Sequence, residues 1–429
     1  MRTGLGERVA AAVGEEAARL VERFVDETLN RAARRLDDGT VFLATGDIPA
    51  MWLRDSTAQV LPLLRLGAYC PPAESFAVGV LRRQLACIVL DPYANAFNAG
   101  PDGTGHQRDR TLMSPHVWER KYEVDSLCYP LHLAERFWRG TGRGDVFDGL
   151  YWRAVARVVE LWEVEQDHEA RSPYRFRRRF APATGTLSRR GLGAPVAATG
   201  LTWSGFRPSD DACVHGYNVP GNMFAALVLS RLPQVAEAAP PGAIHDSTLT
   251  DLLERATRLR TAIEQGLREH AVVADAVTGP RWAYEVDGLG GVLEMDDANV
   301  PSLLSLPRLG YCGFDDPLYR ATRAFVLSPR NPQYYSGTAA AGVGSPHTPR
   351  WHVWPIALAT AALTDPDPEV KRTAVATLLE TRGGTDRIHE SFHMDRPRKW
   401  TRGWFSWAEA TFCELVLDCC GLPALPGEG

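Results

Sequence analysis

Several short segments of this chain place carboxylates beside arginine and aromatic side chains, a combination suited to holding a polyol. The first, GDIPAMWLRDSTAQ at residues 46–59, carries Trp52, Arg54 and Asp55 almost side by side. An indole face can pack on a sugar ring, while arginine and carboxylate groups hold hydroxyls through charge-assisted hydrogen bonds, about twice as strong as neutral ones. A structural ion pair beside a core tryptophan is the alternative for any single segment. Recurrence of the pattern favours a carbohydrate site.

Comparable segments follow along the chain, and each precedes or begins an apolar stretch with helical spacing. Such junctions are expected to meet at one end of a helical barrel. The sequence has no CxxC pair and no EF-hand-like loop, so neither a metal nor a cofactor is predicted. The further segments are YEVDS at 122–126, and 203–224, 284–304, 344–355 and 387–410.

Hydrolysis of a glycosidic bond needs two carboxyl groups in different protonation states. One is protonated and donates to the leaving oxygen, while the other is ionised and activates water or attacks the sugar. Glu390 in HESFH is one candidate, with an exposed loop glutamate as its structural alternative, and Asp210 or Asp211 in RPSDDA is the other. Two near carboxylates raise the pKa of one of them, but one aspartate could instead cap the following helix. The residues alone leave the choice between Asp210 and Asp211 open.

Helical periodicity dominates the remaining sequence and predicts a mainly α-helical toroid. Apolar residues recur at intervals of three and four over residues 7–36. Strand-like alternation is short and is expected to form hairpins in loops, at 41–45, 178–183, 200–204 and 281–287. Residues 233–246 are interpreted as a surface insertion. The other predicted helices are 57–68, 74–89, 123–139, 149–166, 220–232, 247–270, 297–307, 316–327, 351–364, 367–381 and 403–420.

Length and composition are those of a soluble globular protein and disfavour several partner classes. The 429 residues carry a formal net charge of −5 that is spread without blocks, which argues against nucleic acid and anionic membranes as partners. No stretch reaches transmembrane length, and most of the eight cysteines lie in apolar surroundings, which predicts a reducing, cytoplasmic setting. No domain boundary is evident, so residues 1–429 are expected to form a single catalytic domain. No oligomeric state is predicted.

Six motifs, taken in order, resemble those of glycoside hydrolase family 125, a family of exo-acting α-1,6-mannosidases. They are GDIPAMWLRDSTAQ, YEVDS, SGFRPSDDA, DDANVPSLLSLP, GSPHTP and HESF, and the resemblance extends over nearly the whole chain. It implies an (α/α)6 barrel with small β-hairpins in its active-site loops. It also implies metal-independent, inverting hydrolysis that releases mannose from the non-reducing ends of α-mannoside oligosaccharides such as N-glycan fragments.

The resemblance further implies roles for individual residues. Asp210 is the expected general acid, favoured over Asp211 because it stands first in the pair, and Glu390 is the expected general base. Trp52, Arg54 and Asp55 match an element that binds the sugar at the cleavage subsite. Other matching residues are expected to line the cleft, namely Glu123, Asp125, Arg207, Asp211, His215, Asp297, Asn299, His347 and Trp407.

Two other functions fit the same sequence. A helical toroid could bind carbohydrate without cleaving it, and an (α/α)6 glycosidase could act on another sugar, as glucosidases and trehalases do. A glycan assay separates both from the mannosidase. The inverting mechanism adds a geometric expectation, because water must fit between the base and the sugar, which places the two carboxyl groups about 6.5–9.5 Å apart.

Overall fold

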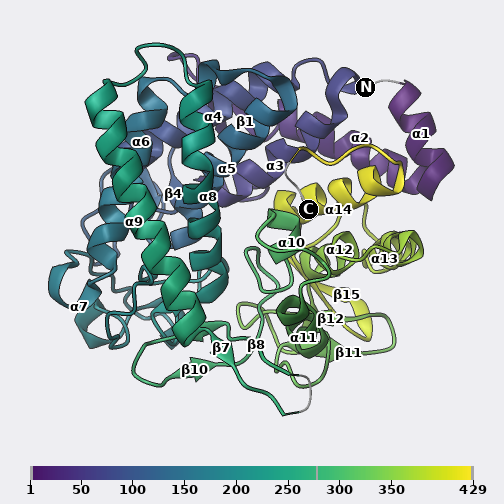
Figure 1. Cartoon of the computed structure of the whole chain (residues 1–429). Helices are drawn as coiled ribbons and strands as arrows, with labels where there is room; N and C mark the ends of the chain where they lie inside the picture. The colour runs from purple at the N-terminus through teal and green to yellow at the C-terminus, as the bar shows by residue number, and fades with distance from the viewer. Residues whose placement is uncertain (1–2, 277–278, 427–429) are drawn as a thin grey trace. The chain divides into compact units, whose positions relative to one another are not determined.

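The computed structural model describes residues 3–276 and 279–426, and the chain folds into two compact units. Unit 1 contains Met1–Met51, Asp55–Val80 and Met295–Gly429, and unit 2 contains Trp52–Arg54 and Leu81–Glu294. The purple N-terminal and yellow C-terminal helices in Figure 1 therefore both belong to unit 1. Helices α3 (Leu53–Leu66) and α4 (Ala73–Leu90) each contribute residues to both units.

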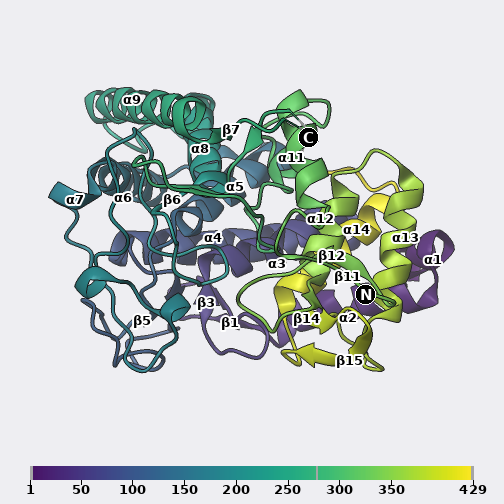
Figure 2. The same cartoon turned by 90° about the horizontal axis from the view of Figure 1, so that it is seen from below.

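Unit 2 is built mainly on long helices that pack against one another. Helix α8 contacts both α5 and α9, and α8 and α9 run side by side in both views (Figure 1, Figure 2). Asp148 caps α6 by accepting from the amides of Leu150 and Tyr151, and Asn218 caps α8 by accepting from the amide of Gly221. Helix α5 ends at Gly142, which has a φ of 73°. The bounds are α5 Val124–Thr141, α6 Gly149–Glu165, α7 His168–Arg171, α8 Val219–Ala238 and α9 Asp246–His270.

Short antiparallel strands brace the loops of unit 2. Strand β9 lies between β10 and β6 and places Glu285 opposite Asn218, the residue that caps α8. Strand β5 pairs with β4 so that Glu119 lies opposite Ala96. The bounds are β4 Ala96–Phe97, β5 Val117–Glu119, β6 Tyr217–Asn218, β7 Val272–Val273, β8 Arg281–Trp282, β9 Glu285–Val286 and β10 Val292–Leu293.

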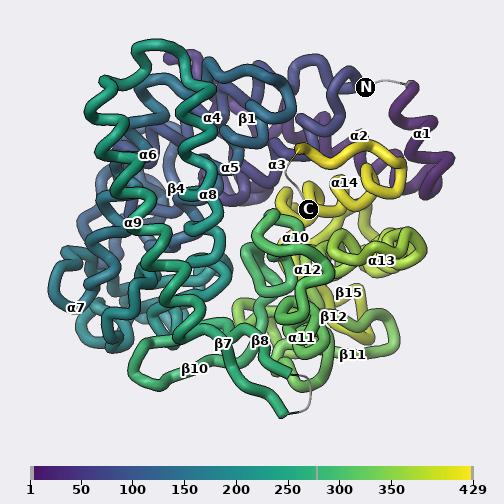
Figure 3. The backbone as a smooth tube through the Cα atoms, in the orientation of Figure 1, coloured from purple at the N-terminus to yellow at the C-terminus, as the bar shows by residue number. Residues whose placement is uncertain are grey.

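Unit 1 joins helices from the two ends of the chain. Helix α14 packs against α2, α12 and α13. Figure 3 shows α12, α13 and α14 as neighbouring coils. Burial on α2 follows the helical period, with Ala17, Leu20, Val21 and Phe24 turned inward. The bounds are α1 Thr3–Val13, α2 Glu15–Asn30, α10 Leu306–Leu309, α11 Pro317–Val326, α12 Pro355–Leu363, α13 Pro368–Glu380 and α14 Ser406–Cys419.

A three-stranded antiparallel sheet in unit 1 carries the HESF motif. Strand β14 lies between β13 and β15, with His393 opposite His352 and Ser391 opposite Thr401. Glu390 therefore stands directly before the central strand. The bounds of the strands in unit 1 are β1 Ala33–Arg35, β2 Val41–Leu43, β11 Tyr334–Ser336, β12 Ala341–Val343, β13 His352–Val353, β14 Ser391–His393 and β15 Arg396–Thr401.

The mainly helical pattern predicted from the sequence is confirmed, and most helix boundaries agree to within a few residues. The predicted helix over 7–36 is two helices, α1 and α2, because Gly14 between them has a φ of 94°. The predicted helix over 297–307 is mostly loop, since the Asp296 carboxylate accepts hydrogen bonds from the amides of Leu303 and Leu304. Backbone amides bonded to a side chain outside the segment are withdrawn from a helical ladder.

Other expectations were wrong in detail. Residues 178–183 and 200–204, all of which the structure describes, form no strand, whereas 41–45 and 281–287 contain the predicted strands. The supposed insertion at 233–246 begins as the last turns of α8, which runs to Ala238 through an internal proline. Among the described residues, no helix is long and apolar enough to cross a membrane.

Candidate active site

A single buried arginine gathers three carboxyl groups in unit 2. Arg54, in the first turn of α3, donates through Nη1 to Glu123 Oε2 at 2.6 Å and to Asp125 Oδ2 at 3.1 Å. Its Nη2 atom lies 3.8 Å from Asp210 Oδ1. The side chains of Arg54, Glu123 and Asp125 are at most 2% exposed, whereas that of Asp210 is 22% exposed. Asp210 is thus the carboxyl of the group that solvent, and hence a substrate, can reach.

The start of helix α5 positions two of these carboxyls. Glu123 is the N-cap residue and Asp125 lies in the first turn, where the partial positive charge of a helix N-terminus stabilises anions. Ser126 donates its hydroxyl to Glu123 Oε2 at 2.7 Å. The YEVDS motif therefore places its acidic residues by helix geometry.

A tight turn presents Asp210. The Asp210 amide donates to the Arg207 carbonyl at 2.9 Å, and the Arg207 amide donates to the Asp211 carbonyl at 2.8 Å. Asp210 has a φ of 63°, a left-handed conformation that aspartate and asparagine adopt more readily than most residues. Its Oδ1 atom accepts hydrogen bonds from Asn95 Nδ2 at 2.7 Å and from Trp52 Nε1, in strand β3 (Met51–Trp52), at 3.4 Å.

Burial changes the proton affinities in this group. Desolvation raises the pKa of Glu123 well above its usual value, and the neighbouring carboxyls Asp210 and Asp125 add to the increase while Arg54 opposes it. Desolvation likewise raises the pKa of Asp125 to about 6, again against the charge of Arg54. The site favours retention of a proton among its carboxyls, as general acid catalysis requires.

The remaining predicted residues of unit 2 lie in a second set of ion pairs. Arg207 pairs with Glu285, and this pairing raises the pKa of the guanidinium despite its burial. Glu285 Oε2 also accepts from the amides of Val214 and His215, at 2.8 and 2.9 Å. His215 Nδ1 lies 3.1 Å from Asp287 Oδ2. These contacts fix both sides of the 207–215 loop, which carries Asp210 and the buried Asp211.

An aromatic cluster packs around Trp203, shortly before this loop in the chain. The His168 ring stacks on Trp203 with centroids 3.6 Å apart. Its Nδ1 atom lies 2.6 Å from Glu165, which also accepts from the hydroxyls of Tyr93 and Ser172 at 2.6 Å. Trp203 is 1% exposed and begins the chain segment that leads to Asp210. The segment that leads to the Asp210 turn therefore begins among buried, packed side chains.

Glu390 lies in a different setting, in unit 1. Burial raises the pKa of its carboxyl, while the positive charge of Arg402 and His347 and a hydrogen bond with Thr401 lower it. Arg402 Nη1 is 3.9 Å from Glu390 Oε1. The carboxyl is 9% exposed, so the alternative of an exposed loop glutamate is wrong.

Arg402 and His389 organise the backbone around Glu390. Arg402 has a φ of 50° and donates to Asp47 Oδ1 through Nε at 2.9 Å and to the Thr45 carbonyl at 2.9 Å. His389 stacks on Trp400 with centroids 4.0 Å apart, and its Nδ1 atom lies 2.9 Å from the Arg402 carbonyl. Since a carbonyl only accepts, Nδ1 carries the hydrogen. The two ends of the β14–β15 hairpin are thereby tied together beside the carboxyl.

The other predicted residues of unit 1 form local polar contacts. Asp55 accepts a hydrogen bond from the Thr45 hydroxyl. Asp297 accepts from Asn299 Nδ2 at 2.8 Å and from the Ser345 hydroxyl at 3.1 Å. His347 donates its amide to the same hydroxyl at 3.2 Å, which joins the DDAN and GSPHTP motifs. Trp407, in the first turn of α14, is buried with its ring 6.0 Å from that of Phe405.

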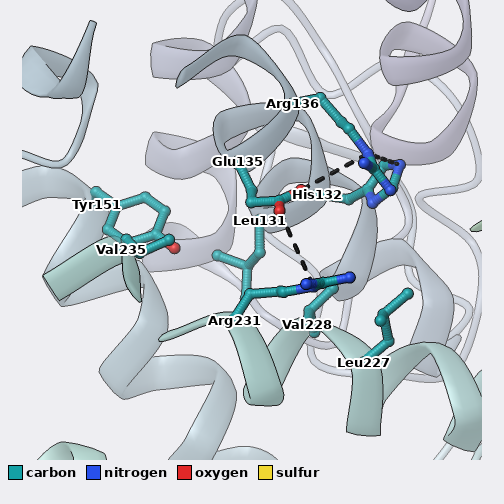
Figure 4. Close-up of a pocket in the computed structure, with 9 residues that line it drawn as sticks. All are labelled: Leu131, His132, Glu135, Arg136, Tyr151, Leu227, Val228, Arg231 and Val235. Carbon is teal, nitrogen blue, oxygen red and sulfur yellow. Dashed lines mark hydrogen bonds and ion pairs between the residues drawn. The ribbon is translucent and has the colours of Figure 1, made fainter. Parts of the chain in front are cut away.

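Helices α5, α6 and α8 line a small cavity with its own charged cluster (Figure 4). Glu135 lies 3.6 Å from Arg136 Nε and 4.0 Å from Arg231 Nε, and it also pairs with Arg139. Arg136 Nε lies 3.4 Å from His132 Nε2. The apolar part of the wall comes from Leu131, Tyr151, Leu227, Val228 and Val235. The nine lining residues include no predicted site residue, and the cluster serves helix packing.

Sequence reasoning missed three residues that hold the candidate catalytic groups. Asn95 donates to Asp210, Glu285 pairs with Arg207, and Arg402 faces Glu390. Glu285 lies inside YEVDG, a near copy of the YEVDS motif, and that repetition was the available signal. Asn95 and Arg402 stand in segments without a recognisable pattern, so only the folded chain identifies them.

Comparisons with known proteins bear on the family. The family model described as metal-independent α-mannosidase, glycoside hydrolase family 125, matches residues 14–417. A metal-independent α-mannosidase from Streptococcus pneumoniae, solved as a non-productive complex with α-1,6-mannobiose, is 44% identical. The alignment covers 97% of each chain with a TM-score of 0.93. The meiotically up-regulated gene 157 protein of Schizosaccharomyces pombe is 36% identical over 94% of this chain and 82% of its own length.

More distant glycosidases share the fold alone. A glycosidase solved with glucose is 13% identical, with a TM-score of 0.52 over 98% of this chain and 99% of its own. The fold is the predicted (α/α)6 class, as in the S. pneumoniae enzyme. The chain belongs to glycoside hydrolase family 125, and it is a metal-independent α-mannosidase.

Proposed function

We propose that the protein is an inverting exo-α-1,6-mannosidase that removes terminal mannose from α-mannoside oligosaccharides, including N-glycan fragments. The observation that carries the linkage is the α-1,6-mannobiose complex of the S. pneumoniae relative, which aligns over 97% of this chain. The motifs that led from the sequence to the family supply the residues for the chemistry.

Asp210 acts as the general acid in this proposal. Support comes from its place beside two buried carboxyls, from its partial exposure, and from the amide and indole donors that hold Oδ1. Asp211 is 4% exposed, whereas the side chain of Asp210 is 22% exposed and lies 3.8 Å from Arg54 Nη2, which supports Asp210 as the acid. The acid protonates the leaving oxygen as the bond to the anomeric carbon breaks.

Glu390 acts as the general base that removes a proton from the attacking water. Burial raises the pKa of its carboxyl and the positive charge of Arg402 lowers it, and a general base is most effective when its pKa lies near the working pH. Attack on the face opposite the leaving group gives inversion and requires a carboxyl separation of about 6.5–9.5 Å.

The other residues of the motifs bind or shape the sugar site. In this proposal Trp52 packs on the mannose ring, and Asp55, Asp211 and His215 contact its hydroxyls. Arg54 is itself buried and acts by holding Glu123, Asp125 and Asp210 rather than by gripping the sugar directly. The further residues assigned to the cleft are Arg207, Asp297, Asn299, His347 and Trp407.

A time-resolved NMR assay tests this function. Purified protein is incubated with α-1,6-mannobiose, and the anomeric signals are followed before mutarotation. The proposal expects β-mannose as the first new product, whereas α-mannose would exclude inversion. Matched α-1,2- and α-1,3-mannobioses and α-linked glucobioses test the specificity, and no cleavage of any of them by a folded protein would favour a carbohydrate-binding toroid.

Two further features belong to the same proposal. The whole chain acts as one catalytic domain, which is supported by a family match that includes residues of both compact units. The protein works in the cytoplasm. Burial raises the pKa of the Cys87 thiol to about 12, and thiols that stay protonated fit that setting. Fractionation of the source cell tests the second point, and activity in EDTA equal to that in buffer tests the absence of a metal requirement.

A further inference from the structure

The register of the β14–β15 hairpin makes Arg402 the cross-strand neighbour of Glu390. Ser391 lies opposite Thr401 in this antiparallel pair, so the next position outward brings Glu390 and Arg402 together. Side chains at opposite positions have Cβ atoms about 4.5–5.5 Å apart, close enough for a direct ion pair. Arg402 Nη1 nevertheless stays 3.9 Å from Glu390 Oε1, beyond hydrogen-bond distance. Other contacts of the guanidinium account for this separation.

The turn between β2 and β3 occupies two of the three nitrogens of this guanidinium. Asp47 Oδ1 accepts from Arg402 Nε at 2.9 Å and also from Nη2, and the Thr45 carbonyl accepts from Nη2 at 2.9 Å. The guanidinium also lies over the Phe405 ring, 4.5 Å from its centroid. Nη1 is the nitrogen directed at Glu390. Asp47 is thus bonded directly to the cation, whereas Glu390 receives its charge at longer range.

Main-chain contacts set the position of Asp47. Its amide donates to the Trp404 carbonyl at 3.1 Å, which ties the turn to the segment after Arg402. Gly46 has a φ of 66°, and a Cβ atom at this residue would lie 2.3 Å from the same carbonyl oxygen. Glycine permits both the conformation and the close approach. The turn should therefore keep its place when the Asp47 side chain is changed.

We propose that Asp47 is a positioning residue that holds Arg402 away from direct pairing with Glu390 and so preserves the basicity of that carboxyl. The inference rests on Glu390 as the general base, as proposed above. A guanidinium bonded directly to Glu390 would occupy an oxygen that water needs and would lower its proton affinity further. At 3.9 Å the same cation stabilises the carboxylate without a hydrogen bond to its oxygen.

The groups that act on the proton affinity of Glu390 come from several segments. Burial raises the pKa of its carboxyl, and the charge of Arg402, after β15, lowers it. His347, before β13, and a hydrogen bond with Thr401 on β15 lower it as well, while the negative charge of Asp47 raises it. His347 is the same in every variant below. Differences between the variants therefore report on Asp47 and Arg402.

Two substitutions separate the charge of Asp47 from its hold on Arg402. Asp47→Asn removes the charge but keeps an oxygen that can accept from Arg402, whereas Asp47→Ala removes both. Loss of the negative charge lowers the pKa of Glu390 in either variant. Release of the guanidinium in Asp47→Ala should lower it further. We expect the acid limb of kcat/KM to move down by about 0.5–1 pH unit in Asp47→Ala, and by less in Asp47→Asn.

The kinetic pattern identifies the group that is affected. With the carboxylate of Glu390 occupied, the kcat of Asp47→Ala on α-1,6-mannobiose should fall about three- to tenfold, with little change in KM. Cleavage of α-mannosyl fluoride needs little proton donation to the leaving group but still needs the base, so it should fall by the same factor. Glu16→Ala is the matched control, because Glu16 is a partly exposed carboxylate that pairs with Arg382 in the same unit. It should leave both rates unchanged.

A double variant tests whether Asp47 acts through Arg402. In an Arg402→Gln background no guanidinium can move onto Glu390, so Asp47→Ala should cost little further activity. At pH values above the acid limb, the kcat of the double variant should exceed that of Asp47→Ala alone. Simple addition of the two single effects would show that the residues act independently and would contradict the proposal.

Several other outcomes would overturn the inference. Equal shifts in Asp47→Asn and Asp47→Ala would reduce Asp47 to a charge, and an unchanged profile would leave it without influence on the base. An upward shift would mean that it directs Arg402 towards Glu390, and a higher KM with unchanged kcat would indicate contact with substrate.

A titration that needs no turnover separates this inference from the proposed function. Carboxyl ¹³C NMR should give the highest pKa of Glu390 in the wild-type protein, a lower one in Asp47→Asn and the lowest in Asp47→Ala. Another order contradicts the hold on Arg402. If that order is found but wild-type protein does not cleave mannobiose, the proposed function alone is contradicted.

Discussion

The two proposed catalytic carboxyls occupy environments that differ in how charge is balanced. In unit 2, Asp210 lies 3.8 Å from Arg54, which pairs with Glu123 and Asp125, and burial raises the pKa values of Glu123 and Asp125. In unit 1, Glu390 faces the guanidinium of Arg402, and His347 also lowers its pKa against the effect of burial. Nearby carboxyls raise the pKa of a buried acid, and a nearby cation lowers it.

This difference teaches how similar side chains are given opposite tasks. Both regions bury acidic groups, so desolvation alone would make both of them acids. The neighbours differ, because the carboxyls Asp210 and Asp125 raise the pKa of Glu123 against Arg54. At Glu390 the positive charges of Arg402 and His347 lower the pKa, and Asp47 raises it. The following predictions test that contrast, from the largest expected effect to the smallest.

Removal of the base should have the largest effect. Glu390→Gln keeps the size of the side chain but cannot take a proton from water, so kcat/KM should fall by about 10³-fold or more on both α-1,6-mannobiose and α-mannosyl fluoride. Steady-state kinetics of the two substrates measures this. A variant that lost activity on mannobiose alone would contradict the assignment of the base.

Removal of the acid should depend on the leaving group. Asp210→Asn fits the left-handed backbone at this position, where φ is 63°, so the fold should be retained. Activity on α-1,6-mannobiose should fall by about 10³-fold, and activity on α-mannosyl fluoride by less than about tenfold. The same kinetics on Asp211→Asn is the control, and a larger leaving-group dependence there would transfer the role to Asp211.

Neutralisation of the cation beside the base should move one limb of the pH profile. The positive charge of Arg402 lowers the pKa of Glu390, so Arg402→Gln raises that pKa, and the base becomes protonated at higher pH. The acid limb of kcat/KM should move upward by about one pH unit. Arg402→Lys keeps the charge and should leave the limb nearly in place. A downward shift in Arg402→Gln would reverse the charge argument.

Loss of one hydrogen bond to the acid should have the smallest effect. Trp52→Phe retains an aromatic ring but removes the Nε1 donor that lies 3.4 Å from Asp210 Oδ1. A long neutral hydrogen bond contributes about 1 kcal/mol or less, so kcat/KM on mannobiose should fall about two- to fivefold. A loss as large as that of Asp210→Asn would show that Trp52 does more than orient the acid.

Local patterns predicted most helices and some hairpins but not where long-range contacts interrupt them. The period of apolar residues identified α6 and α9 closely, because each buries one face along its length. It also identified α5, which is buried on all sides from Val124 to Phe137. The predicted helix over 297–307 failed because the carboxylate of Asp296 binds amides seven and eight residues away. That bond depends on a buried aspartate, and no periodicity in the sequence encodes it.

The site shows the same division. Motifs identified Arg54, Glu123, Asp125, Asp210 and Glu390 as residues with suitable chemistry, and the family they indicate is the one to which the chain belongs. The motifs grouped Arg54 with Asp55 as residues that bind the sugar. In the folded chain the guanidinium contacts the carboxyls of Glu123 and Asp125, which lie 69 and 71 residues away in the sequence.

The sequence by itself determined the helical class, the family and the types of residue available for glycoside hydrolysis. These follow from local periodicity and from short motifs in a fixed order. Only the tertiary structure decided which carboxyls share Arg54, that Asn95 contacts both Glu123 and Asp210, and that Arg402 faces Glu390. The physical reason is that proton affinity depends on burial and on neighbouring charge, and both are set by contacts between residues far apart in the chain.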